Sequence, residues 1–152
     1  MTEFDQLARG MFKRATSDDS QEYGNFFLSR LLGFEFEFGS GLCSVCFEAS
    51  RLLQNPQGSL HGGILALAMD MSMGHRIHHV AGVAATVELK VQYFAPITSG
   101  IVRCEASFLS RGRKISLLES RALRADRVLV AHATATWKQR TQIDVFAPHP
   151  KF

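Results

Sequence analysis

The chain has 152 residues, a hydrophobic fraction of 46%, a charged fraction of 20% and a formal net charge of +3. These values fit one folded domain and exclude a disordered chain. No apolar run reaches the roughly 18 residues that a transmembrane helix needs. The first residues lack the basic and apolar segments of a secretory signal. We therefore expect a cytoplasmic protein that does not bind membranes. The positive charge is too mild and too dispersed to indicate nucleic-acid binding.

The amino-terminal third predicts a polar lead, one helix and a hairpin. Asp19 or Ser20 can cap the helix and Gly33 can end it. Its apolar positions recur with helical spacing, at Phe27, Leu28, Leu31 and Leu32. Two strands follow, over residues 34–38 and 42–49, and the turn Gly39-Ser40-Gly41 joins them.

The rest of the chain predicts one long buried helix from His61 to about Ile77 and then strands alone. The strands cover residues 84–94, 100–110, 114–124 and 127–138. We therefore predict an α+β hotdog fold, an antiparallel meander of five to six strands wrapped around one central helix. One helix cannot cover both edges of such a sheet, so pairing with a second copy is expected.

The predicted organisation is a helical lead over residues 1–32, a domain over residues 33–140 and a tail over residues 141–152. The pattern does not distinguish a dimer from a tetramer of paired dimers. No repeat or linker divides the chain, so we expect a single domain overall.

Two groups of metal-ligating side chains have simpler interpretations. Cys43 and Cys46 lie three residues apart on a predicted strand and therefore point to opposite faces. We expect both, and the third cysteine, to pack in the interior rather than bind metal. His75, His78 and His79 share one side of the helix end, where histidine also interacts well with the helix dipole. We therefore predict no metal site, although the sequence does not decide whether these three histidines bind a metal ion.

The chemistry that needs explaining begins at the helix entry, His61-Gly62-Gly63. Backbone N–H groups in a first helical turn have no intrahelical partners and carry partial positive charge. Glycine lets a ligand approach them closely, so Gly62 can polarise a carbonyl oxygen and Gly63 can border the substrate. The alternative is that both glycines only permit tight packing.

Asp70 lies in the least polar stretch of the helix, Ala-Leu-Ala-Met-Asp-Met-Ser-Met. Burial would raise the pKa of its carboxyl and make it a usable general base. The alternative is a carboxylate that accepts structural hydrogen bonds. His61 and Asp70 are nine residues, or about 13 Å, apart on one helix and point to opposite sides. Two antiparallel copies of the helix could combine them, which predicts that activity requires a dimer.

Several motifs occur together along the chain and carry a resemblance to a known family. They are Asn55 with Gly58-Ser59-Leu60-His61-Gly62-Gly63, then Asp70, Thr86-Val87-Glu88-Leu89, Tyr93-Phe94-Ala95-Pro96, Gly100, Arg111-Gly112-Arg113-Lys114 and residues 130–136. From about Gly33 to Trp137 this pattern resembles the hotdog acyl-CoA thioesterases of the phenylacetate-degradation type.

The resemblance implies a role for each matching position. Gly62 N–H and the Asn55 amide would polarise the thioester carbonyl. Asp70 of the partner subunit would activate water or attack directly, and Thr86 would help to orient that water. His61 would position the site and assist the departing thiol. No cofactor is implied beyond the CoA of the substrate.

Other positions are expected to contact the substrate. Met69, Met73 and Phe94 are candidate walls of the acyl pocket. The basic turn with Arg111, Arg113 and Lys114 is either a solvated hairpin tip or a contact to CoA phosphates. Two rival functions remain: a non-catalytic acyl-CoA sensor, and a hotdog hydratase or dehydratase. Asp70 favours hydrolysis over a pure binder, and the place of His61 favours carbonyl polarisation over proton transfer at carbon.

Overall fold

A six-stranded antiparallel sheet packed on one long helix forms the body of the molecule, and the predicted hotdog fold class is confirmed. The computed structural model describes residues 1–140, and the predicted tail lies outside them. The long helix is α3 (Gly62–Ala81). The strands are β1 (Glu35–Gly39), β2 (Leu42–Glu48), β3 (Ala84–Tyr93), β4 (Ile101–Arg111), β5 (Ile115–Arg124) and β6 (Leu129–Gln139).

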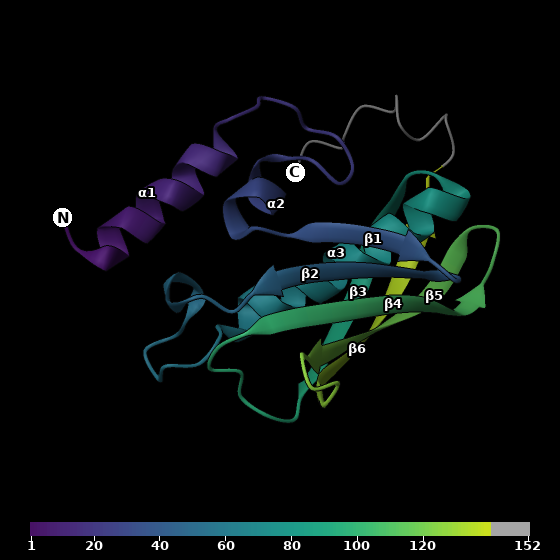
Figure 1. The fold of residues 1–152 in the computed structure, drawn as a ribbon. Coiled ribbons are helices and arrows are strands. Elements are labelled where there is room, and N and C mark those ends of the chain that lie inside the picture. Colours follow the sequence, from purple (N-terminus) through teal and green to yellow (C-terminus); the bar gives the residue numbers. More distant parts are fainter. Residues whose placement is uncertain (141–152) are drawn as a thin grey trace, which may run out of the picture.

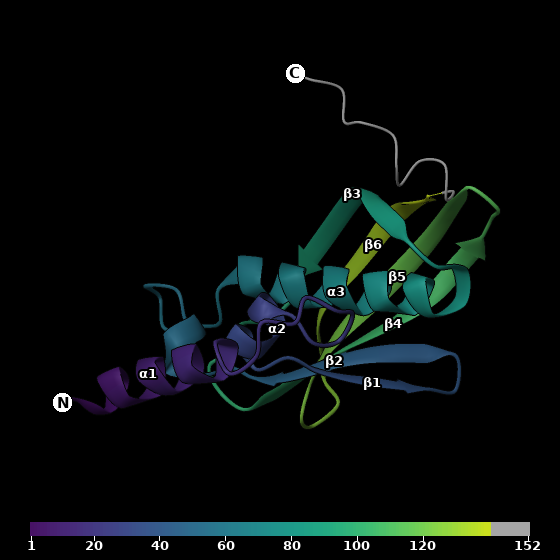
Figure 2. The ribbon, with the colours of Figure 1, turned by 90° about the horizontal axis from the view of Figure 1, so that it is seen from above.

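The strand order is β1-β2-β4-β5-β6-β3, so the predicted simple meander is wrong in one respect (Figure 1). α3 carries the chain from β2 across the sheet, and β3 then pairs with β6 at the far edge. Figure 2 shows α3 lying along the sheet between the β1–β2 hairpin and β3. β1 and β3 are therefore the edge strands, and α3 fills the space that the curved sheet encloses.

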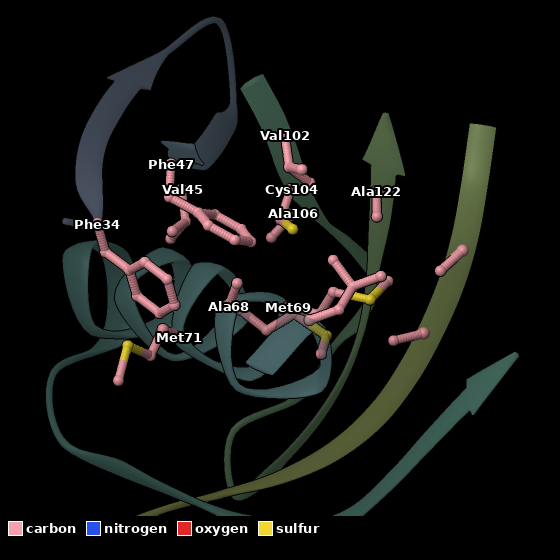
Figure 3. Close-up of a cluster of buried hydrophobic side chains, with 14 of the residues drawn as sticks. Phe34, Val45, Phe47, Ala68, Met69, Met71, Val102, Cys104, Ala106 and Ala122 are labelled. Atoms are coloured by element: carbon pink, nitrogen blue, oxygen red, sulfur yellow. The ribbon is translucent and has the colours of Figure 1, made fainter. Parts of the chain in front are cut away.

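The core lies between α3 and the inward face of the sheet. In Figure 3, Ala68 of α3 points toward Val45 and Phe47 of β2, and Met71 lies beside Phe34. Trp137 packs against the helix so closely that a Cβ at Gly74 would lie 2.9 Å from its ring atom Cη2. Glycine at that position therefore allows the helix and β6 to approach each other.

The amino-terminal region contains two helices where one was predicted, α1 (Glu3–Ala15) and α2 (Phe27–Leu32). Thr2 caps α1 through a capping box with Asp5, a sequence signal that the polar composition of the segment obscured. Neither Asp19 nor Ser20 caps α2, because that helix starts after Phe26. Gly33 does end it, in the left-handed conformation with φ of 69°.

α1 projects beyond the sheet and is joined to α2 by two arginines (Figure 1). Arg14 Nε donates to Arg30 O at 2.6 Å, and Arg30 Nε donates to Ala15 O at 3.0 Å. A short 3-10 helix, η1 (Arg51–Leu53), follows β2 and leads to the loop before α3. No helix among residues 1–140 is both long and apolar enough to span a membrane.

Candidate functional site

His61 caps α3, and one other amide of the helix entry has no hydrogen-bond partner in the part of the chain that the structure describes. The Nδ1 of His61 accepts a hydrogen bond from Gly63 N at 2.9 Å. A neutral imidazole in this arrangement carries its proton on Nε2, which is then a donor. Gly63 N–H is thus occupied by the cap. Among the hydrogen bonds of the described residues, Gly62 N–H makes none, so it can donate to a ligand.

Asn55 shapes the loop in front of this entry. Its Oδ1 accepts from Gln57 N at 2.9 Å and from Ser59 N at 3.3 Å, and its Nδ2 donates to Ser59 Oγ at 3.2 Å. These contacts fix the direction of the carboxamide. One of the two hydrogens on Nδ2 remains for another acceptor. Sequence reasoning selected Asn55 but missed Ser59, whose contact is evident only once the loop is folded.

A cavity of about 310 Å³ lies beside the helix entry and brings three of the predicted residues together. Asn55, Gly62 and Phe94 all line it. The remaining lining residues are Ser59, Leu60, Leu65, Tyr93, Ala95, Pro96 and Ile97. Six of the ten lining residues are apolar, and Asn55, Ser59, Gly62 and Tyr93 contribute polar groups, a mixture that suits a small-molecule site.

Tyr93 contacts the helix entry and was not among the predicted site residues. Its hydroxyl donates to Gly62 O at 2.7 Å. Partial burial raises the pKa of the Tyr93 phenol, so the hydroxyl stays protonated and remains a donor. The only sequence signal was its place in the Tyr-Phe-Ala-Pro motif.

Asp70 lies eight residues after Gly62 along α3, and its side chain is half-buried. Burial raises the pKa of its carboxyl, and a hydrogen bond from Thr86 opposes part of that rise. Thr86 Oγ1 donates to Asp70 Oδ1 at 2.9 Å. Among the described residues, Asp70 Oδ2 has no hydrogen-bond partner and is free to accept a proton.

A β-bulge explains how Thr86 reaches the helix. Thr86 and Tyr93 are seven residues apart, and in a regular strand they would point to opposite faces. The pairing of β3 with β6 shifts between Thr86 and Glu88, so the bulge absorbs one residue. Thr86 then lies opposite Trp137, which packs on α3. Both ends of β3 therefore face the same helix.

The two halves of the predicted site remain apart within one chain. Asp70 is absent from the lining of the cavity that contains Gly62. Eight residues of helix separate them by about 12 Å along the axis. Met69 and Met73 are fully buried in the core and line no part of that cavity, so their contact with an acyl group stays a prediction.

The basic turn lies at the opposite end of α3. Arg111 Nη2 donates to Val80 O at 3.0 Å, near the end of the helix, and Arg113 and Lys114 are exposed. The 20-residue helix is about 30 Å long, so this turn cannot contact the cavity of its own chain.

The histidines at the end of α3 pack with aromatic rings instead of facing a common ion. His75 Nε2 accepts from Gly24 N at 2.8 Å, and its ring stacks on Phe36 at 4.0 Å. His78 stacks on Tyr23 at 3.5 Å. No group of three His, Cys, Asp or Glu side chains in residues 1–140 is placed to hold a metal.

The cysteines are buried, as expected: burial raises the pKa of Cys43 to about 12, so its thiol stays protonated.

The chain resembles several known proteins, among them the following three. A Saccharolobus solfataricus protein named "Putative esterase SSO1253" is 28% identical over 109 residues, which cover 70% of this chain and 73% of that protein. The structure of BH2602 from Bacillus halodurans with CoA matches with a TM-score of 0.83 and 22% identity, over 93% of this chain and 96% of that one. PaaI of the Escherichia coli phenylacetic acid degradation operon matches with a TM-score of 0.74 and 16% identity, over 89% and 96%.

The two solved structures establish a likeness of fold. The match that concerns the helix entry directly is a family model described as "Thioesterase superfamily", which covers residues 57–131. That range contains the entry of α3, Asp70 and Thr86. The helix-entry amide, the half-buried carboxylate and the strand β3 that contacts both thus fall within one family match, and residues 57–131 form a thioesterase superfamily domain.

Proposed function

We propose that this protein is an acyl-CoA thioesterase of the phenylacetate-degradation type, which converts a thioester and water into a carboxylic acid and CoA. One observation carries the proposal: within residues 1–140, α3 presents a Gly62 amide without a hydrogen-bond partner beside a cavity, and a half-buried Asp70 with one free carboxylate oxygen. The amide suits a developing oxyanion, and the carboxylate suits removal of a proton from water.

In the proposed reaction, the thioester carbonyl oxygen accepts hydrogen bonds from Gly62 N–H and from Asn55 Nδ2. Asp70 of the partner subunit removes a proton from water, and the resulting hydroxide attacks the carbonyl carbon. The tetrahedral intermediate then breaks its carbon–sulfur bond, and the thiolate leaves and takes up a proton. The protonated Asp70 carboxyl supplies that proton and so returns to its starting state, and His61 Nε2–H can donate a hydrogen bond to the departing sulfur. Direct attack by Asp70 is the alternative and would form an anhydride that hydroxylamine traps.

Two observations support CoA as the thiol part of the substrate: the positive charge of the basic turn and the CoA in the name of a structural neighbour. The BH2602 structure is named as one with CoA. Here Arg111, Arg113 and Lys114 form an exposed basic turn that suits the phosphates of CoA. Since the turn lies far from the cavity of its own chain, it would serve the site of a neighbouring chain. No metal or organic cofactor enters the proposed reaction.

The test is release of free thiol from a panel of acyl-CoA esters, each compared with its acyl-pantetheine counterpart. We expect turnover of some acyl-CoA, with a higher kcat/KM than for the matching pantetheine ester. Binding of acyl-CoA without thiol release would instead identify a binding module. Equal kcat/KM for both esters would remove the basic turn from substrate recognition.

A dimer with shared sites is part of the proposal. β3 is an edge strand, with Val87, Tyr93 and Phe94 each more than half exposed. A second copy could cover this edge and bring its Asp70 toward the cavity.

Complementation tests the shared site directly. Asn55→Ala and Asp70→Asn chains are made together with different affinity tags. In a one-to-one mixture about half of the dimers combine both variants, and each holds one intact site out of two. Activity should return to about a quarter of wild type. A mixture as inactive as either variant alone would place the complete site in one chain.

A further inference from the structure

We propose that Tyr93 is the positioning residue for the Gly62 amide, holding the helix entry in the orientation that the thioester carbonyl requires. The inference rests on the proposed function, and it concerns a residue that acts through Gly62 rather than on the reacting atoms. Its basis is the contact between the end of β3 and the start of α3, 31 residues apart in the chain.

The helix entry needs an external restraint because two glycines follow each other there. Glycine reaches a wider range of φ and ψ than other residues, and the first turn of a helix lacks intrahelical bonds to its N–H groups. His61 restrains Gly63 by accepting its N–H. Gly62 must keep its own N–H free for substrate, so it can be held only through its carbonyl or its Cα.

Tyr93 holds Gly62 through both. The hydroxyl donates to Gly62 O at 2.7 Å, and the ring lies against the Cα, where a Cβ would be 3.3 Å from Tyr93 Cζ. A side chain at position 62 would therefore press on the ring.

The strand keeps Tyr93 itself in place. Tyr93 lies opposite Ala131 in the ladder with β6, and the next residue, Phe94, donates its N–H to Val130 O at 2.8 Å. Tyr93 thus ties Gly62, a residue that lines the cavity, to the position of the sheet.

The experiment compares Tyr93→Phe with Tyr23→Phe, the matched change at the other tyrosine of the chain. Tyr23 stacks on His78 and its hydroxyl has no hydrogen bond among the described residues. For Tyr93→Phe we expect kcat to fall about three- to tenfold, the range for one neutral hydrogen bond. KM should stay within about twofold, because an oxyanion donor acts mainly in the transition state. Tyr23→Phe should leave both constants unchanged.

A second measurement needs no substrate. Backbone ¹⁵N relaxation gives the order parameter of the Gly62 amide, which we expect to fall from about 0.85 in wild type toward about 0.6 in Tyr93→Phe. The proposal requires both changes, and a wild-type value of either kcat or the order parameter in Tyr93→Phe overturns it. If wild-type protein releases no thiol from any acyl-CoA, the proposed function falls, and the order parameter alone decides whether Tyr93 holds Gly62.

Discussion

Replacing Asp70 by asparagine removes the proposed base while keeping the shape of the side chain. The Asn oxygen can still accept the Thr86 hydroxyl that now bonds Oδ1 at 2.9 Å. The free Oδ2 becomes an NH₂ group, which donates and cannot take a proton from water. Because general-base catalysis contributes about 10²–10⁴-fold, we expect kcat to fall by that factor.

The same substitution should not weaken the fold at neutral pH. Burial raises the pKa of Asp70, so the folded state holds its proton more tightly than the unfolded state does. The charged carboxylate therefore destabilises the folded state. This effect is absent at pH values below the ordinary pKa of the unfolded state and is fully present at pH values above the raised pKa of the folded state. Asp70→Asn should therefore be at least as stable as wild type at pH 7, and the difference should disappear in acid.

Thiol release from the best acyl-CoA of the panel and thermal unfolding at pH 7 measure the two effects. Asp126→Asn is the matched control, since Asp126 is an exposed carboxylate in the turn between β5 and β6. The control should keep wild-type turnover. Asp70→Asn protein that retains more than about a tenth of wild-type kcat would refute the general-base role.

Four further changes have definite expected outcomes. Thr86→Val removes the hydrogen bond that lowers the pKa of Asp70, so the acidic limb of the kcat/KM profile should move to higher pH. Asn55→Ala should lower kcat by about 10²–10³-fold in the same thiol assay, and a loss below tenfold would remove its amide from carbonyl polarisation. Burial lowers the pKa of His75, so the unfolded state binds its proton more readily, and thermal stability should decline as pH falls below about 6.5; a His75→Gln variant should lose less over that window. Leu118→Ala, at a fully buried position, should cost about 2–5 kcal/mol in denaturant unfolding.

Local patterns in the sequence were enough to predict most elements, because each has a short-range cause. The apolar run after His61 gave the helix, and alternation gave the strands from residue 84 onward. The strand order was not accessible in this way. Whether β3 pairs with β4 or with β6 depends on which edge of the sheet lies next to the end of α3. No local sequence pattern specifies that edge.

The candidate site shows the same limit. Asp70 could be selected from the sequence because burying a carboxylate in an apolar helix costs free energy unless the group is paired or hydrogen-bonded. Its bond to Thr86 depends on a bulge, which alternation along the strand does not reveal. Tyr93 was missed because an aromatic residue at the end of a strand has no chemical signature until its hydroxyl is seen on Gly62 O.

β3 relates the two halves of the proposed site. Its first half bonds Asp70 through Thr86, and its last residue bonds Gly62 through Tyr93, so one edge strand supports both groups. A two-fold axis through this edge would pair β3 with its copy in antiparallel fashion. The start of each strand would then lie toward the end of the other, and Asp70 of the partner subunit would move toward Gly62. The 12 Å that separates the two groups within one helix is thus the kind of spacing that dimerisation could bridge, and the complementation experiment measures whether it does.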